Sequence, residues 1–370
     1  MQLLNTFHIL PGPIYEPRAF LNSRYIEFSK FSYGTLVALG IEDEEYTFGN
    51  FKIVLVGCHQ RFTYKEKLKL FTVAYREFRL LNRKKVDLII CYDPLKTGLM
   101  GLIFKLLSSA KLIVEVNGIY NSPVLYANRG RKQALKGKYY PKIQNFIMSR
   151  ADGLKCLFKG QLDGYSIPKK VKTEYFFDYT DIVEVERPAL GKKIILTIGY
   201  PVFVKGIDNL IDVFSELYTK YPDWKLLIVG YFFREPVPIE TVIAGRPGIE
   251  VRKPVTFREI PDLIDACDIF VLASRSEAMG RVLIEAMARG KARIGTRVGG
   301  IPTVVNHNQD GLLVESDNKT ELKEAIEKLI NSEELRLKFG CAGIKRFREE
   351  FTLQNFSHCV KSFYYEVMSS

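Results

Sequence analysis

The chain has 370 residues, too many for one ordinary domain and enough for two domains that each bury a core of their own. Its 47% hydrophobic and 26% charged residues exclude a disordered protein, and no apolar run reaches the roughly 18 residues of a membrane span. The net charge of +12 lies in residues 1–180, where 28 basic and 15 acidic side chains indicate an acidic partner for this half alone.

The opening MQLLNTFHIL has no basic segment and no long apolar run, so we expect no signal peptide. The six cysteines are scattered, with no CxxC pair and no metal-ligand spacing to the four histidines. Buried thiols in a reducing compartment fit this pattern best, and the sequence predicts a cytoplasmic protein.

The N-terminal half predicts helices that alternate with buried strands. A helix over Tyr64–Asn82 is expected to bury one apolar face made of Leu68, Phe71, Tyr75, Phe78 and Leu81. Asp87–Cys91 and Lys111–Val116 are almost continuous apolar runs, typical of parallel strands that are buried on both faces. Thr97–Leu107 is predicted as the helix between them.

The C-terminal half shows the same alternation more clearly. We expect strands at Ile194–Ile198, Lys225–Val229, Ile249–Arg252, Asp268–Ala273, Ala292–Thr296 and Gly311–Val314. Helices are expected at Ile207–Lys220, Ile260–Ala266, Arg281–Ala288 and Lys319–Ile330, the last capped by Ser316-Asp317. β-Branched runs that alternate with amphipathic stretches predict a doubly wound α/β domain.

A polar passage over residues 179–193 separates the two halves and precedes a new strand. We therefore predict an N-terminal domain at residues 1–185 and a C-terminal domain at 186–352. The helical stretch Phe356–Val367 lies in a final segment, 353–370, that we expect to pack back onto the first domain.

The segment from Glu277 to Glu285 is the sharpest local signal. A buried strand ends just before it, and Gly280 lets the backbone approach a ligand before a helix begins, whose free N–H groups suit a phosphate. Glu285 lies one helical turn after Arg281, from where a carboxylate can accept hydrogen bonds from a ribose diol. The simpler interpretation is a capped helix start with Glu285 solvated.

A second candidate lies at Lys205-Gly206, again between a strand and a helix at the carboxyl edge of the same predicted sheet. A lysine at a helix entry is well placed to neutralise a diphosphate, although a plain surface lysine is the alternative. Gly299-Gly300-Ile301-Pro302 is a third strand-to-helix turn. Its glycines serve either backbone geometry or ligand contact.

The run SRSEAMGRVLIEAMARGKARIGTRVGGIPTVV, followed by DGLLVE, resembles the retaining GT-B glycosyltransferases of family 4, also called group 1. The order TIGYPVFVKGIDNLIDVF, KLLIVG, EIPDLIDACDIFVLAS matches the same family, so the likeness covers nearly the whole C-terminal domain. It implies an α/β fold of two Rossmann-like doubly wound domains that face each other across a cleft. It also implies transfer of a sugar from a UDP- or GDP-linked donor with retention at the anomeric carbon.

The resemblance assigns roles to matching residues. Glu277 is similar to the glutamate that contacts the transferred sugar and Glu285 to the one that contacts the ribose, while Lys205 is similar to the diphosphate-binding lysine. Lys205 and Glu277 are thus the expected catalytic pair. The donor-binding residues implied besides Glu285 are Met279, Gly280, Arg281, Val282, Val255 and Gly12.

The sequence departs from the family at three places. Tyr200 stands where an arginine is usual beside the lysine, and Arg281 is the candidate substitute by position. Asn117 stands where a histidine is common after the third strand; an amide can contact sugar or acceptor but is no base. Leu10-Pro11-Gly12-Pro13 replaces the usual glycine pair of the N-terminal donor loop.

Retention with the leaving diphosphate taking the acceptor proton needs no enzymic base, and no Asp-x-Asp cluster is present to hold a divalent ion. We therefore expect a metal-independent enzyme with no cofactor besides its nucleotide-sugar co-substrate. A non-catalytic sugar-nucleotide-binding scaffold and a GT-B nucleotide-sugar epimerase are the alternatives that share this architecture.

The basic half is the only guide to the acceptor. Arg129–Lys142 carries six cations and no acid, with Tyr139 and Tyr140 suited to a lipid interface, and Arg61–Lys85 carries nine more cations. Each run is also explained by a solvated helix face. Together they predict peripheral attachment to the inner face of an anionic membrane and a glycan or lipid-linked acceptor, whereas the absence of a nucleic-acid-binding motif predicts no nucleic-acid partner.

Overall fold

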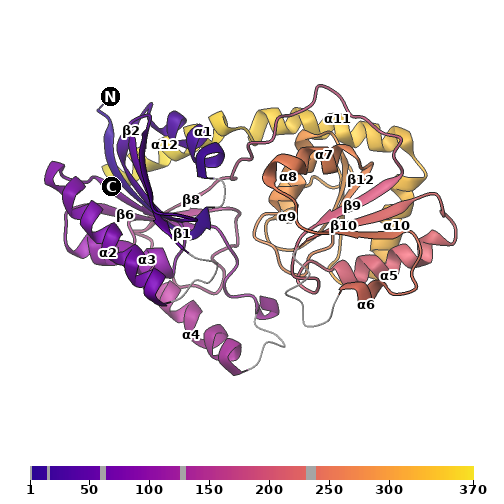
Figure 1. Ribbon diagram of the computed structural model, residues 1–370, viewed down its shortest axis with the longest axis horizontal. Coiled ribbons are helices and arrows are strands. Elements are labelled where there is room, and N and C mark those ends of the chain that lie inside the picture. The colour runs from indigo at the N-terminus through magenta and orange to yellow at the C-terminus, as the bar shows by residue number, and fades with distance from the viewer. Residues whose placement is uncertain (1, 15–16, 59–63, 126–130, 231–238) are drawn as a thin grey trace. The chain divides into compact units, whose positions relative to one another are not determined.

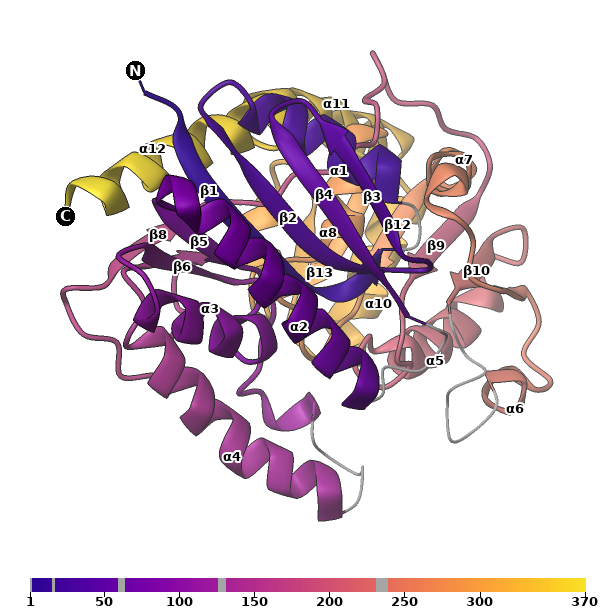
Figure 2. The same ribbon diagram turned by 60° about the vertical axis from the view of Figure 1, so that its left-hand side comes forward.

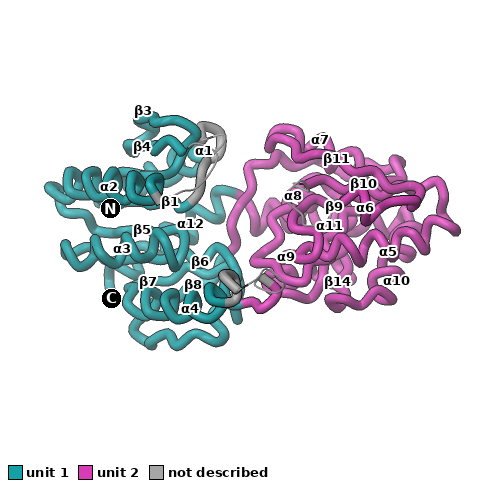
Figure 3. Tube along the Cα trace, turned by 60° about the horizontal axis from the view of Figure 1, so that its bottom comes forward, with its two compact units in different colours: residues 1–121, 126–176, 353–370 teal, residues 122–125, 177–352 magenta. Residues whose placement is uncertain are grey.

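The computed structural model describes residues 2–14, 17–58, 64–125, 131–230 and 239–370 (Figure 1). Contacts divide the chain into two compact units, which Figure 3 draws in different colours. Unit 1 comprises residues 1–121, 126–176 and 353–370, and unit 2 comprises residues 122–125 and 177–352. Each unit is built around its own sheet.

The described part of unit 1 forms an eight-stranded sheet in the order β3-β4-β2-β1-β5-β6-β7-β8. The strands are β1 (Leu4–Ile14), β2 (Ser32–Gly40), β3 (Glu44–Phe48), β4 (Phe51–Gly57), β5 (Leu88–Cys91), β6 (Lys111–Val116), β7 (Gly153–Cys156) and β8 (Lys172–Tyr175). The pair β3–β4 is antiparallel and the other pairs are parallel. The strands expected at residues 87–91 and 111–116 are confirmed.

Helices cover both faces of this sheet: α1 (Pro17–Phe28) and α12 (Leu353–Ser369) lie on one face, with α2 (Tyr64–Leu81), α3 (Lys96–Leu106) and α4 (Arg131–Met148) on the other (Figure 2). α12 packs on α1, where the ring of Phe356 stacks on that of Phe28 at 6.2 Å between centroids. The Lys111 ammonium also donates to the carbonyl of Val367 at 2.8 Å. The chain end is thereby fixed to the N-terminal sheet.

The expected apolar face of α2 is wrong in part. Leu68 is 66% exposed, whereas Leu70, Ala74 and Phe78 are buried against the sheet. The buried residues follow a spacing of four, so the inward face is turned relative to the expected one. Ala74 at its centre allows the helix to lie close to β2, which a large aromatic side chain there would prevent.

The described part of unit 2 forms a six-stranded, fully parallel sheet in the order β11-β10-β9-β12-β13-β14. Its strands are β9 (Ile194–Ile198), β10 (Lys225–Val229), β11 (Ile249–Arg252), β12 (Ile269–Leu272), β13 (Ala292–Thr296) and β14 (Leu312–Val314). Its helices are α5 (Ile207–Tyr218), α6 (Ile239–Ile243), α7 (Ile260–Asp265), α8 (Arg281–Ala288), α9 (Ile301–Val304), α10 (Lys319–Ile330) and α11 (Glu333–Glu350). The six expected strands and the doubly wound architecture are confirmed.

The expected cap of α10 is wrong. Asn318 is the capping residue, and its side-chain oxygen accepts a hydrogen bond from the Glu321 N–H at 3.1 Å. Asp317 instead has a left-handed backbone conformation, with φ of 62°, and its carboxylate points to other partners.

Candidate functional site

The candidate site lies at the carboxyl edge of the sheet of unit 2, where the strand order changes direction. β9 is the first strand of this unit, and the chain proceeds from it to β10 on one side and later to β12 on the other. The loops that follow β9 and β12 therefore diverge from neighbouring strand ends. Open α/β sheets bind ligands at such a switch point.

Two glycines allow close contacts at this edge, one between the two loops and one within the loop that follows β9. Gly206 begins α5 with φ of 63°, and a Cβ atom there would lie 1.9 Å from the carbonyl oxygen of Ala273. A Cβ atom on Gly199 would lie 3.1 to 3.2 Å from the carbons of the Lys205 side chain. The backbone of each glycine thus makes room for a contact that a larger residue would block.

Lys205 and Glu277, the expected catalytic pair, meet between the loops. The Lys205 ammonium donates to Glu277 Oε2, and the two side chains are only 19% and 14% exposed. The other carboxylate oxygen, Oε1, accepts from the backbone N–H of Ala278 at 3.1 Å. A partly buried lysine and carboxylate at a sheet edge supply a donor for phosphate and an acceptor for sugar hydroxyls side by side.

The expected donor-binding residues 279–282 surround the start of α8. Met279 is buried, and Gly280 is the residue that begins the helix, with φ of 78°. Arg281 and Val282 form the first turn of α8 and are half-buried. The N-terminal end of α8 directly follows the loop of Glu277, and the positive end of a helix dipole favours anionic groups.

Glu285 lies one turn further along α8 and is only 6% exposed, so the interpretation of it as a solvated residue is wrong. Burial raises the pKa of Glu285 from 4.5 to about 6, and the nearby Arg281 guanidinium opposes this rise. The Thr180 hydroxyl donates to Glu285 Oε1 at 3.4 Å. The carboxylate therefore retains lone pairs that a ribose diol can use.

The raised pKa predicts that Glu285→Gln stabilises the protein while it weakens nucleotide binding. Between pH 4.5 and 6 the folded state holds more protons than the unfolded state, so stability falls as pH rises through this window. Above pH 6 the charged carboxylate costs about 2 kcal/mol, at ~1.4 kcal/mol per pKa unit. Glutamine carries no charge, and its amide hydrogens cannot accept from the ribose.

We expect unfolding in urea at pH 7.5 to require about 2 kcal/mol more for Glu285→Gln than for the wild type, with the two converging near pH 4.5. Fluorescence of Trp224, the single tryptophan, reports unit 2 directly because this residue is buried there. A Glu285→Gln variant whose free energy of unfolding equals that of the wild type at pH 7.5 as well as at pH 4.5 would contradict the burial cost.

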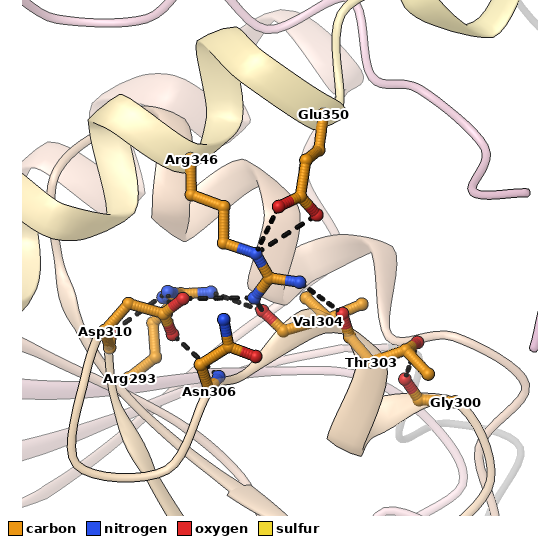
Figure 4. Close-up of polar contacts among 8 residues, drawn as sticks. All are labelled: Arg293, Gly300, Thr303, Val304, Asn306, Asp310, Arg346 and Glu350. Atoms are coloured by element: carbon orange, nitrogen blue, oxygen red, sulfur yellow. Dashed lines mark hydrogen bonds and ion pairs between the residues drawn. The ribbon is translucent and has the colours of Figure 1, made fainter.

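The turn at Gly299-Gly300 also touches the donor loop. Gly300 N–H donates to the carbonyl of Ala278 at 3.0 Å, and α9 follows directly. At the other end of α9, Arg346 donates to the carbonyls of Thr303 at 2.6 Å and Val304 at 2.9 Å (Figure 4). The short helix is therefore held at both ends.

The residues that hold α9 belong to a buried charge network, which was not predicted from the sequence. Arg293 is fully buried in β13 and donates to Asp310 Oδ1 at 2.8 Å and to the Val304 carbonyl at 3.2 Å. Arg346 donates to the second oxygen of Asp310 at 3.0 Å (Figure 4). An arginine inside the apolar strand 292–296 is the signal that could have revealed it, because an arginine is almost never fully buried without a partner.

The other expected site residues lie elsewhere. Val255 is half-buried in the loop after β11, next to the capping residue Thr256. Gly12 belongs to β1, but its surroundings lie outside the described residues. The expected roles of both residues stay predictions.

Asn117 follows β6 in unit 1, and its amide is already engaged. The NH2 group donates to Glu115 Oε2 at 3.2 Å and to the Tyr92 carbonyl at 3.3 Å, and the amide oxygen accepts from the buried Lys155 ammonium at 3.2 Å. Both N–H donors have partners, so a sugar or acceptor contact through this side chain would use the remaining lone pair of the oxygen.

Residues 178–346 match the family model described as "Glycosyl transferases group 1". The chain is 29% identical to an uncharacterised glycosyltransferase of Methanocaldococcus jannaschii, over 78% of each chain. It is 28% identical to the N-acetyl-alpha-D-glucosaminyl L-malate synthase of Bacillus anthracis over 54% of this chain and 55% of that one. It is also 34% identical to the capsular polysaccharide biosynthesis glycosyltransferase CapM of Staphylococcus aureus, over 42% of each. With the last two, the match thus spans only about half of the relative's length.

Solved structures of glycosyltransferases share the fold over nearly the whole chain. The sucrose-phosphate synthase of Thermosynechococcus elongatus superposes with a TM-score of 0.79, covering 99% of both chains at 16% identity. HepE of Anabaena, in complex with UDP-glucose, gives a TM-score of 0.68 with the same coverage and identity. The chain therefore has the GT-B fold, and its residues 178–346 form a domain of the group 1 glycosyltransferase family.

Proposed function

We propose that the chain is a retaining hexosyltransferase. It moves a sugar from a UDP- or GDP-linked donor to a hydroxyl of a glycan or lipid-linked acceptor in the synthesis of a cell-surface polysaccharide or glycolipid. The observation that carries the proposal is the convergence of Lys205 and Glu277 at the sheet edge, with the buried carboxylate of Glu285 further along α8. HepE, bound to UDP-glucose, and CapM, named for capsular polysaccharide, support the donor and product classes.

In the proposed reaction, the bond between the anomeric carbon and the diphosphate oxygen breaks as the bond to the acceptor oxygen forms on the same face. The acceptor proton passes to the departing diphosphate. Lys205 and the N–H groups at the start of α8 offset the negative charge that grows on this diphosphate, and Glu277 orients the sugar through its hydroxyls. This assignment needs neither a base at Asn117 nor a metal ion, and we propose a metal-independent reaction.

A thermal-shift screen with UDP, GDP, ADP and their sugars tests the donor assignment. A ligand that binds only the folded state stabilises it by ~2.7 kcal/mol at one hundred times its Kd. We expect one nucleoside diphosphate to raise the melting temperature of the wild type. Wild-type protein that no nucleoside diphosphate stabilises, and that hydrolyses none of the donors, would refute the proposed function.

We also propose that α4 attaches unit 1 to an anionic membrane. Its described surface carries an exposed apolar stripe spaced at helical intervals, made of Leu135, Tyr139, Ile143 and Phe146, which are 42 to 55% exposed. Lys136, Lys138 and Lys142 are exposed on the same helix. Apolar side chains flanked by lysines favour the lipid interface.

The two basic runs are described only in part, because Arg129 and residues 61–63 lie outside the described residues. Among the helices that the structure describes, none has the length and apolar composition to cross a bilayer.

Sedimentation with vesicles of phosphatidylcholine alone, or with added phosphatidylserine, checks the membrane proposal. Each lysine near an anionic surface contributes ~1 kcal/mol, so replacing Lys136, Lys138 and Lys142 by glutamine should weaken binding to the anionic vesicles about 100-fold. The matched control replaces three exposed lysines of unit 2, Lys253, Lys338 and Lys345, and should bind as the wild type does. Equal binding to both vesicle types by the wild type would exclude electrostatic attachment.

A further inference from the structure

Arg275 lies in the loop after β12, two residues before Glu277, and its side chain is only 9% exposed. None of the sequence motifs assigns it a role, and the proposed chemistry does not use it. Its backbone N–H donates to the carbonyl of Val204 at 2.8 Å, which links the loop of Glu277 directly to the loop of Lys205.

The Arg275 guanidinium makes four further hydrogen bonds. Nη1 donates to Asp208 Oδ1 at 2.7 Å and Nη2 donates to Asp208 Oδ2 at 2.8 Å, a two-point contact with the first turn of α5. Nη1 also donates to the carbonyl of Phe203 at 2.6 Å, and Nε donates to Asp317 Oδ1 at 2.6 Å. The guanidinium lies over the ring of Phe203, 4.2 Å from its centroid.

These contacts bracket Lys205 on both sides. Phe203 and Val204 precede it, Asp208 follows it, and each is bound by the same arginine. The ammonium at the far end of the Lys205 side chain pairs with Glu277, whose backbone is two residues from Arg275. One side chain therefore fixes the distance between the two loops that carry the expected catalytic pair.

We propose that Arg275 is a positioning residue, which holds the Lys205 loop against the Glu277 loop so that the Lys205 ammonium meets the donor diphosphate. The inference rests on the proposed function for its substrate. Lysine cannot reproduce the contact, because its ammonium lacks the planar fork that binds both oxygens of Asp208 and the Phe203 carbonyl together.

Arg289 offers a matched control in the same unit. It binds Asp265 through two nitrogens and donates to the carbonyl of Val183 at 2.7 Å, and its side chain is 16% exposed. It thus makes the same kind of contact at the far end of α8, beyond the described contacts of Lys205 and Glu277. Arg275→Met and Arg289→Met remove comparable interactions, only one of which touches the Lys205 loop.

The first measurement is hydrogen–deuterium exchange of peptides that cover residues 199–206. Lys205 N–H donates to the Pro201 carbonyl and Gly206 N–H to the Phe203 carbonyl, so their exchange reports whether this loop stays closed. We expect at least a tenfold faster exchange there in Arg275→Met and no change in Arg289→Met. This result does not depend on the nature of the ligand, so it separates a failure of the positioning role from a failure of the proposed function.

The second measurement is binding of the nucleoside diphosphate that stabilises the wild type, compared with its nucleoside. We expect Arg275→Met to weaken the diphosphate at least tenfold and to leave the nucleoside unchanged, because Glu285 is not displaced. In a Lys205→Met background the Arg275→Met change should cost nothing more, since it acts through that lysine. Unchanged exchange, equal losses for diphosphate and nucleoside, or additive losses in the double variant would each overturn the proposal.

Discussion

Replacing Lys205 by alanine should lower kcat/KM for the sugar donor by about 100- to 1,000-fold, the usual loss when one preorganised donor to a developing anion is removed. Glu277 makes the expected loss larger. In Lys205→Ala its carboxylate, 14% exposed, keeps the Ala278 N–H but loses its ion pair, and it then stands as an unneutralised charge beside the place of the diphosphate.

This repulsion gives the prediction an internal check. Glu277→Gln in the Lys205→Ala background removes the unpaired charge, so nucleoside diphosphate binding should partly recover in the double variant while turnover stays low. Steady-state donor hydrolysis or transfer and calorimetric binding measure the two effects separately. Lys220→Ala is the control, since it breaks an ion pair with Glu327 on the exposed surface of the same unit and should leave turnover unchanged.

If the Lys205→Ala variant keeps its activity, the active site does not lie at the place that we propose. A variant that binds the nucleotide sugar normally, in a chain whose wild type neither transfers nor hydrolyses it, would favour the scaffold interpretation instead. Tyr200 and Asn117 are the reason to test the scaffold interpretation, because they stand where similar sequences usually have a charged residue and a base.

The sheet of unit 2 could be predicted because parallel strands buried on both faces read as short apolar runs. Ile194–Ile198 and Ala292–Thr296 have the expected bounds for this reason. The ends of such strands also define the sheet edge, and so Lys205 and Glu277 could be placed near each other before any contact was known. Their direct ion pair depends on how closely Gly206 approaches Ala273, a distance that no pattern contains.

The first four strands of unit 1 were not predicted, and for β1 and β3 the residues show why. β1 buries Asn5, Thr6 and His8 among its apolar side chains, so its hydrophobic pattern is interrupted. β3 is a short antiparallel edge strand, EEYTF, whose residues are exposed or half-buried. Pattern recognition finds strands that are apolar throughout, whereas β1 and β3 depend on partners from elsewhere in the chain. β2 and β4 are apolar along most of their length and could have been predicted.

Polar networks are the second class of feature that the sequence conceals. Asp317 was expected to cap α10, but its carboxylate binds Arg275 and Asn209, and the adjacent Asn318 caps the helix. Cap propensity identifies the right segment but cannot choose between neighbouring side chains when one of them has a tertiary partner. Arg275 itself has no sequence signal, because its partners are set by the meeting of three loops.

Replacing Asp310 by alanine should lower the free energy of unfolding of unit 2 by about 3 to 5 kcal/mol, the usual cost of leaving a buried charge without its partner. Asp310 is 2% exposed and receives Arg293 and Arg346 on its two oxygens, as well as the Asn306 N–H at 3.0 Å (Figure 4). Burial lowers the pKa of Arg293 to about 10 even with Asp310 beside it, so the guanidinium of the wild type is charged at pH 7.5 and loses the partner of that charge in the variant.

Among the described residues, Asp310 has two arginine partners, whereas Arg293 has one carboxylate partner. A comparison of variants at these positions therefore separates the contribution of charge pairing from that of packing. Arg293→Met leaves Asp310 paired with Arg346 and fills much of the same volume, so it should cost less than Asp310→Ala although it removes the more deeply buried group. Asp212→Ala, which breaks two half-exposed ion pairs with Arg246 and Lys319, should cost under about 1 kcal/mol. Urea unfolding followed by Trp224 fluorescence ranks the three variants.

The Asp310 variant should also bind a nucleoside diphosphate more weakly, at urea concentrations far below its unfolding transition. Arg346 and Arg293 hold the α9 carbonyls, and α9 begins where Gly300 binds Ala278, so loss of the cluster should loosen the donor loop. Unfolding of Asp310→Ala at the wild-type urea concentration would show that the two guanidinium groups find other partners and that this cluster does not support the donor loop.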